Sequence, residues 1–244
     1  MTATETDVRR DLAAAFRWTA RLGWHEAVAN HFSAAVSADG SQFLLNPCGR
    51  HFSRMRASEL LLLDAARVGD TVDEAADATA WYLHANLHQR LPHARVVLHT
   101  HQPYATALAC LHEFELLMLD QNSCRFFERV AYDHAYGGMF LDDGEADRVI
   151  SLMGADKRVL FLGGHGVMVI GESVAEAFDA LYYLEHAARL QVLALSTGRP
   201  LQLISDEVAA RTRDQWEHYP AEAARLHFDE LKAILDEDDP SYAS

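Results

Sequence analysis

The residues best suited to chemistry are three histidines that stand at the ends of apolar segments. His99 and His101 follow residues 96–98, which are apolar, partly β-branched and typical of a short buried strand. Residues two apart in a strand point to the same face, so the two imidazoles should project together. His165 lies in a Gly-Gly-His-Gly segment between two further apolar runs. Three neutral imidazoles suit zinc, and also manganese, iron or nickel.

Chance is the alternative explanation for this pattern, because the chain contains 14 histidines. Under that alternative His99 and His101 are ordinary core or surface residues, and His165 faces solvent from a tight hairpin. The surroundings of His165 favour the metal site, since glycines allow close backbone approach and positive φ angles. The sequence therefore predicts one divalent-metal site built from His99, His101 and His165.

Length, charge and cysteine content narrow the class of protein. The 244 residues are half hydrophobic, which is enough for a large packed α/β domain. A net charge of −15 argues against a nucleic-acid partner and against docking on anionic membranes. Three cysteines, together with a first segment that lacks the parts of a secretory signal, indicate a reducing cytoplasm. The expected partner is a small-molecule substrate.

Hydrophobic periodicity predicts the elements that must position the histidines. Apolar residues at three- and four-residue spacing predict helices over residues 6–22, 79–89, 103–111, 145–153 and 174–197. Alternating or continuous apolar runs predict strands over residues 29–36, 42–45, 61–64, 96–98, 159–162 and 167–170. Residues from 206 onward should form polar, outer helices. We expect one α/β domain with a central, mainly antiparallel sheet flanked by helices.

Four ordered motifs resemble those of the class II aldolase and adducin N-terminal domain family. They are Asn30-His-Phe-Ser33, Asn46-Pro-Cys-Gly49, the segment 92–101, and Gly164-His165-Gly166 with its following helix. The resemblance covers residues 8–200 and leaves 201–244 as a helical extension that packs on the same domain. It implies a nine-stranded type of antiparallel sheet and a homotetramer with active sites at subunit boundaries. It also implies a divalent metal, zinc above all, with Mn²⁺ or Fe²⁺ as alternatives.

The chain departs from the aldolases where they carry acid–base and phosphate-binding groups. Ala80 stands at the position of their proton-transferring glutamate, and only Thr79 keeps a hydroxyl from the same motif. Ala27 replaces a phosphate-binding threonine, and Ala35 replaces an arginine that many members carry. Alanine cannot transfer a proton or bind an anion through its side chain. A phosphorylated sugar is therefore not the expected substrate.

Further candidates surround the predicted metal. For substrate binding we expect the polar or glycine positions of the family motifs, namely Asn30, Ser33, Asn46, Gly49 and Thr79. Capping of the hairpin backbone is the alternative role for Asn30 and Ser33. His31 is interpreted as a strand residue rather than as a group that supports the metal ligands.

The segment 132–138 resembles the region from which aldolases supply an acid to the neighbouring subunit. Tyr132, Asp133 and His134 are the candidate catalytic residues there. His134 is preferred because imidazole titrates near neutral pH and needs the least tuning for acid–base work.

Together these features predict a metal-dependent lyase that cleaves a carbon–carbon bond of a small, unphosphorylated hydroxy- or oxo-acid. Decarboxylation is favoured over retro-aldol cleavage, because it starts without removal of a proton and Ala80 offers no base. Two alternatives stay open. One is a non-catalytic, adducin-like binding protein, and the other is a non-haem iron oxygenase with three histidine ligands.

Overall fold

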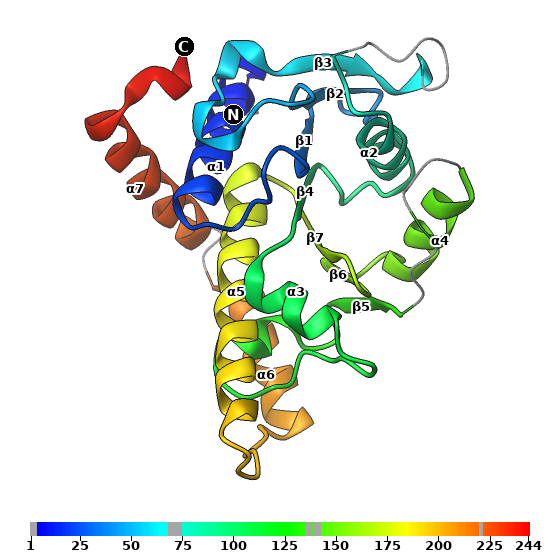
Figure 1. Cartoon of the computed structure of the whole chain (residues 1–244), viewed down its shortest axis with the longest axis vertical. Helices are drawn as coiled ribbons and strands as arrows, with labels where there is room; N and C mark the ends of the chain where they lie inside the picture. Colours follow the sequence, from blue (N-terminus) through cyan, green and yellow to red (C-terminus); the bar gives the residue numbers. More distant parts are fainter. Residues whose placement is uncertain (1–3, 68–74, 135–137, 139–142, 220–221) are drawn as a thin grey trace.

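A seven-stranded sheet forms the centre of the computed structural model (Figure 1), which describes residues 4–67, 75–134, 138, 143–219 and 222–244. The strand order is β3-β2-β1-β4-β7-β6-β5. The strands are β1 (His31–Ala35), β2 (Gln42–Leu45), β3 (Leu61–Asp64), β4 (Val96–Thr100), β5 (Val130–Asp133), β6 (Val159–Leu162) and β7 (Gly166–Gly171). Neighbouring strands are antiparallel, except for the parallel pair β5 and β6.

The expected fold class, a mainly antiparallel sheet flanked by helices, is confirmed. The described part of the sheet has seven strands, however, and not the nine that the family resemblance implied. Strand β5 was not predicted, because its sequence Val-Ala-Tyr-Asp lacks the three consecutive large apolar residues that mark the equally short strands β2, β3 and β6. It runs parallel to β6 because the helix α4 (Asp143–Met153) makes the crossover between them.

Helices cover both faces of the sheet. The face with α1 (Glu5–Arg21), α3 (Pro103–Ala109) and α5 (Val174–Ser196) lies opposite the face with α2 (Ala78–Arg90) and α4, as Figure 1 shows. Short 3₁₀ helices at Phe52–Arg54, Ala57–Glu59, Ala65–Arg67, Ser123–Phe126 and Pro240–Ala243 complete the connections. The long α5 begins where Ser173 accepts a hydrogen bond from the Glu176 backbone N–H at 3.2 Å.

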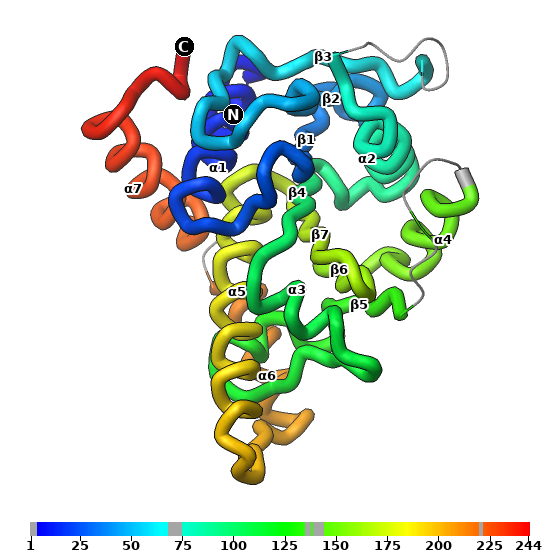
Figure 2. Tube along the Cα trace, in the orientation of Figure 1, coloured from blue at the N-terminus to red at the C-terminus, as the bar shows by residue number. Residues whose placement is uncertain are grey.

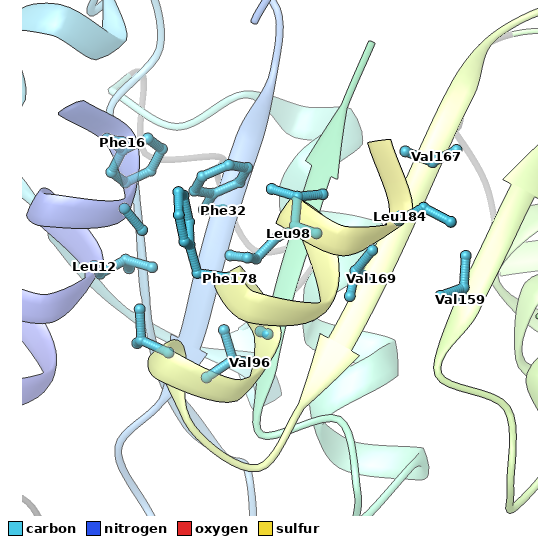
Figure 3. Close-up of a cluster of buried hydrophobic side chains, with 14 of the residues drawn as sticks. Leu12, Phe16, Phe32, Val96, Leu98, Val159, Val167, Val169, Phe178 and Leu184 are labelled. Atoms are coloured by element: carbon cyan, nitrogen blue, oxygen red, sulfur yellow. The ribbon is translucent and has the colours of Figure 1, made fainter. Parts of the chain in front are cut away.

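Alternating side chains of the strands divide the core between these two faces. Val96 and Leu98 of β4 pack with Phe16 and Phe178 from α1 and α5 (Figure 3). Val97, between them in sequence, packs on the opposite side with residues of α2 and α4. Because side chains repeat with a period of two, His99 shares the face of Val97 and is directed toward the α2 side.

The C-terminal helices α6 (Asp206–His218) and α7 (Glu222–Asp238) are helical as expected, but α7 is more than a polar outer element. Figure 2 shows α7 returning to lie beside α1. It buries Phe228 and Leu235, and its Leu231 carbonyl accepts a hydrogen bond from the Trp18 indole at 2.8 Å. Within the described part of the chain, none of the helices is both long enough and apolar enough to cross a membrane.

Candidate metal centre

The three predicted metal ligands converge. One ring nitrogen from each of His99, His101 and His165 lies within 4.8 Å of the others. The ring centroids are separated by 5.1 Å between His99 and His101, 4.8 Å between His99 and His165, and 4.9 Å between His101 and His165. Strand β4 supplies the first histidine, the residues just beyond β4 supply the second, and the β6–β7 turn supplies the third. Three imidazoles in such a cluster are a suitable ligand set for a divalent transition metal.

Hydrogen bonds to the other ring nitrogens orient two of these ligands. The Nδ1 atom of His99 bonds to the Val167 carbonyl at 3.0 Å, and Nδ1 of His101 bonds to the Glu26 carboxylate. Each bond leaves Nε2 with the free lone pair. Among the described residues, the buried Nε2 of His101 has no hydrogen-bond partner. A buried nitrogen that lacks a partner is costly, and a metal ion would satisfy it.

Burial keeps the imidazoles of His99 and His165 neutral. It lowers the pKa of His165 to about 4. Burial, followed by the neighbouring His31 and His165 rings, lowers the pKa of His99 well below its usual range. Metal ligands must be unprotonated, so at neutral pH both lone pairs are available without loss of a proton.

Gly166 allows the strands that carry the ligands to approach each other. A Cβ atom at this position would lie 2.6 Å from the Thr100 carbonyl oxygen and 2.8 Å from Cδ2 of His101. Gly164 has a φ of +64°, which lets the β6–β7 turn reverse direction just before His165. The glycines around His165 therefore act through close approach and turn geometry, as the sequence suggested.

His31 lies against the cluster. It pairs with His99 across strands β1 and β4, and the two ring centroids are 4.7 Å apart. Its Nδ1 bonds to Nε2 of His84 at 2.6 Å. Burial lowers the pKa of His31 to about 4, so this ring is also neutral. The interpretation of His31 as an ordinary strand residue missed these contacts.

The hydrogen-bonded chain continues from His84 into the protein. The Ser33 hydroxyl contacts Nδ1 of His84 and lies 2.7 Å from Nε2 of His88. Nδ1 of His88 in turn bonds to the Ala94 carbonyl at 2.7 Å. The sequence contained a signal for this chain, since positions 31 and 33 share one strand face and positions 84 and 88 share one helix face.

Asn30 and Asn46 hold the polypeptide around the centre. The Asn30 side-chain oxygen accepts a hydrogen bond from the Glu26 backbone N–H at 2.7 Å, which links it to the carboxylate that orients His101. Its side-chain nitrogen is buried without a partner among the described residues. The Asn46 oxygen accepts from the Phe32 N–H at 3.0 Å and ties the β1–β2 hairpin together. Asn30 thus keeps a free donor for a ligand, while Asn46 serves the backbone.

Gly49 and Thr79, two further candidates for substrate binding, have different surroundings. Gly49 is exposed and has a φ of +73°. Thr79 lies at the start of α2, where its backbone N–H donates to the Asp77 carboxylate at 2.9 Å and its hydroxyl bonds to the same oxygen. Ala80 is fully buried in the first turn of α2, so this position offers no titratable group.

The candidate acids lie at the edge strand β5 and just beyond it. The Tyr132 hydroxyl accepts a hydrogen bond from the Leu116 N–H at 3.0 Å, and burial raises the pKa of this phenol to about 12. Asp133 is buried and ion-paired with Arg148. His134 is exposed, with its ring 4.5 Å from that of Phe114. The rest of the expected acid segment, apart from residue 138, lies outside the described residues.

This edge segment adjoins the turn that carries His165, because the Gly163 N–H donates to the Asp133 carbonyl at 2.7 Å. A Cβ atom at Gly163 would lie 2.9 Å from that same oxygen, so the two segments are in close contact. Of the three candidates, His134 is the one whose side chain is open to solvent and to a neighbouring molecule.

The sequence model of the class II aldolase and adducin N-terminal domain matches residues 10–192, a span that contains all three histidines. The chain belongs to this family. An aldolase II superfamily protein from Pseudomonas syringae shares the fold with a TM-score of 0.89 and 32% identity, over 100% of this chain and 98% of that one. An adducin-related protein of Schizosaccharomyces pombe is 31% identical over 256 residues, which cover 99% of this chain and 78% of that protein.

Solved structures of enzymes named as sugar-phosphate aldolases share the fold at lower sequence identity. The L-fuculose 1-phosphate aldolase from Glaciozyma antarctica PI12 has a TM-score of 0.83 over 99% of this chain and 95% of its own. Its identity of 22% supports a common fold only. The family therefore spans proteins related to aldolases and proteins related to adducins, and the fold does not choose between them.

A cavity of about 800 Å³ lies at the other end of β7, next to Gly171. Its described lining does not include the three histidines. Arg125 lies between the Tyr183 and Trp216 rings in its wall, 4.2 and 4.5 Å from their centroids, and donates to Asp179 at 2.6 Å. Because this guanidinium already has partners, we place the chemistry at the histidine cluster.

Proposed function

We propose that this protein is a divalent-metal-dependent lyase that cleaves a carbon–carbon bond of a small, unphosphorylated hydroxy- or oxo-acid. The observation that carries the proposal is the convergence of His99, His101 and His165, two of which are oriented by hydrogen bonds through Nδ1. Zinc is the preferred ion, with manganese or iron as alternatives.

The chain's own residues prepare this site. His99, His101 and His165 would hold the cation, while the Glu26 carboxylate and the Val167 carbonyl keep two of the rings in place. When bound, a divalent cation supplies positive charge that stabilises negative charge on a substrate oxygen as the carbon–carbon bond breaks. The free side-chain N–H donors of Asn30 are available for a substrate carboxylate.

Three positions support an unphosphorylated substrate. Ala27 has a φ of +47°, a backbone conformation that disfavours a β-branched threonine. Ala35 is buried and carries no charge. The Arg50 guanidinium is already bonded to Glu59, with Nε 3.1 Å from the carboxylate, so it has a partner other than a phosphate.

Decarboxylation remains our preferred reaction subclass. The buried Ala80 cannot remove a proton, and loss of carbon dioxide does not begin with a proton transfer. The product must still be protonated, and His134 of a neighbouring copy in a homotetramer is the proposed acid. We propose a cytoplasmic location, which suits the exposed free thiols of Cys48 and Cys110.

Metal analysis of the protein purified without added metal is the first test. We expect about one equivalent of zinc or manganese per chain, and release of carbon dioxide from at least one acid in a panel of oxo-acids and hydroxybenzoates. Bound iron together with oxygen consumption would instead support the oxygenase. Efficient cleavage of a sugar phosphate, with no reaction of any acid, would contradict the proposal.

A binding protein related to adducin is the second candidate. The absence of a side-chain base at Ala80 favours it, as does the 31% identity to the adducin-related yeast protein. Such a protein has no need of a metal ion at the three clustered imidazoles. An unloaded site after purification with zinc present, together with no turnover of the panel, would favour this candidate over the lyase.

A further inference from the structure

The buried chain of histidines next to the metal centre has a fixed hydrogen-bond direction. Its inner end is the Ala94 carbonyl, which can only accept, so Nδ1 of His88 carries the proton. A neutral imidazole has one donor and one acceptor, so Nε2 of His88 accepts from the Ser33 hydroxyl. His84 and His88 are buried, and the hydrogen-bond partners described for the three rings are imidazoles, a hydroxyl and a carbonyl rather than carboxylates, so the rings are neutral.

The same donor-to-acceptor order of the hydrogen bonds continues through Ser33 toward His31. Since the Ser33 proton points to His88, the hydroxyl oxygen accepts from Nδ1 of His84. Nε2 of His84 then accepts from Nδ1 of His31. The outer nitrogen of the chain, Nε2 of His31, is therefore unprotonated and presents a lone pair.

No carboxylate reverses this assignment. Asp77 is the acidic residue whose charge acts on the His31 ring. Its carboxylate accepts the backbone N–H groups of Thr79 at 2.9 Å and Ala80 at 3.0 Å, and so caps α2. The His31 ring bonds through Nδ1 to Nε2 of His84.

The His31 ring lies next to the candidate metal centre. The His31 ring is tilted by 32° from that of His99, with 4.7 Å between their centroids. We infer that Nε2 of His31 accepts a hydrogen bond from a hydroxyl group of the acid held at the three-histidine centre, so that the site selects hydroxy-acids over oxo-acids. This inference rests on the proposed function, because it names the substrate class of that same site.

The selection follows from the kind of atom each acid presents. A hydroxyl group donates to Nε2, whereas a carbonyl oxygen would place its lone pairs against that of the imidazole. A binding site built to accept a hydrogen bond discriminates strongly against a ligand that has no donor. His84, Ser33 and His88 are positioning residues, since they act by fixing the protonated nitrogen of His31.

Lactate and pyruvate test the inference, because they differ only at the second carbon. That carbon carries a hydroxyl group in lactate and a carbonyl oxygen in pyruvate. Their Kd values are measured by calorimetry on the zinc-loaded full chain, and the ratio Kd(pyruvate)/Kd(lactate) is compared between variants. His31→Phe keeps the ring against His99 but removes the lone pair, and we expect the ratio to fall about tenfold. His93→Phe, at the opposite end of β4, is the matched control and should leave the ratio unchanged.

Two further measurements separate this role from a merely structural one. ¹⁵N NMR of histidine-labelled, zinc-loaded protein should show His31 protonated at Nδ1 and unprotonated at Nε2. Ser33→Ala removes the link that sets this tautomer, so it should also lower the Kd ratio while one equivalent of zinc remains bound.

The outcomes distinguish this inference from the proposed function. A wild-type protein that takes up none of zinc, manganese and iron contradicts both. If the protein takes up zinc but the Kd ratio is equal in wild type and His31→Phe, the inference alone is overturned. The same holds if the zinc-loaded protein binds neither acid. Loss of zinc in His31→Phe with retention in His93→Phe would make His31 a metal ligand and would also overturn it.

Discussion

The histidines of this site differ in role because the Nδ1 atom of each ring has a different hydrogen-bond partner. A backbone carbonyl fixes His99, a carboxylate fixes His101, and another imidazole fixes His31. An imidazole whose donor nitrogen is occupied has only one way to present its lone pair. Residue type and spacing alone predicted the three histidines of the candidate metal centre, whereas these partners decide how the rings face it.

Removal of two ligands should abolish metal binding. The variant His99→Ala/His101→Ala leaves a single imidazole, which cannot hold a stoichiometric ion at a centre of this kind. Elemental analysis after dialysis should show less than a tenth of an equivalent of zinc, while His93→Ala retains about one equivalent. Full retention of zinc in the double variant would show that the ion binds elsewhere.

Substitution of Glu26 should weaken the metal without removing a ligand. Glu26→Gln replaces the carboxylate that bonds Nδ1 of His101 by a neutral amide. Loss of such a partner typically lowers metal affinity by about 10- to 100-fold. Competition with a zinc chelator measures this change, and an unaltered affinity would mean that His101 does not depend on Glu26.

The buried carboxyl of Glu185 should make stability depend on pH. Burial raises its pKa to about 7, although both oxygens accept backbone N–H groups at the start of α3, from Tyr104 and Ala105. Between pH 4.5 and 7 the folded state then binds more protons than the unfolded state, so this group's stabilising contribution falls as pH rises. The loss from pH 5 to pH 8 is roughly 3 kcal/mol at most.

Urea unfolding of wild type and Glu185→Gln at both pH values isolates this contribution. Glutamine cannot ionise, so the variant should lack the loss seen in wild type. An identical pH dependence in the two proteins would show that Glu185 is not the responsible group.

At the scale of secondary structure, periodicity predicted the long helices and the central strands because their apolar faces repeat over many residues. It did not reveal β5, where Ala131 interrupts the run of large apolar residues that marks the other short strands. Nor did it reveal the contact between His31 and His84, which lie 53 positions apart. That contact depends on α2 packing over β1, which is tertiary information that no local pattern contains.

Close strand packing at Gly166 should make this position intolerant of a side chain. In Gly166→Ala the new methyl group would meet the Thr100 carbonyl and the His101 ring. We expect a loss of about 1–3 kcal/mol in the free energy of unfolding and a weaker zinc affinity.

Gly164→Ala is the matched control. Its φ of +64° also disfavours alanine, but a Cβ atom there meets nothing within 4 Å. It should therefore cost about 1–2 kcal/mol of stability while zinc affinity stays near that of wild type. Equal zinc affinities for the two variants would contradict the role of Gly166 in placing His101.

The whole molecule presents apolar side chains near the end of α5. Leu190, Leu193 and Leu195 are 46%, 48% and 43% exposed, and Leu203 just beyond is 57% exposed. Large exposed apolar groups that gather on one part of a surface commonly mark protein contacts. They are consistent with the homotetramer implied by the family resemblance.

We expect light scattering to give a mass of about four times 27.2 kDa per particle at micromolar concentration. Leu190→Glu/Leu193→Glu should shift the mass downward without unfolding the chain. A monomer at every concentration would refute the assembly, and with it the role of His134 as an acid supplied across a subunit boundary.

The position of β4 in the middle of the sheet also determines when the metal site can form during biosynthesis. Its two neighbours, β1 and β7, come from opposite ends of the domain, and His99 is held by a carbonyl 68 positions later in the chain. As the polypeptide emerges from the ribosome, His99 and His101 appear long before His165. Pairings between distant segments form slowly, because a long loop must close first. Zinc capture should therefore be a late step, and its rate in refolding would report when the two halves of the domain join.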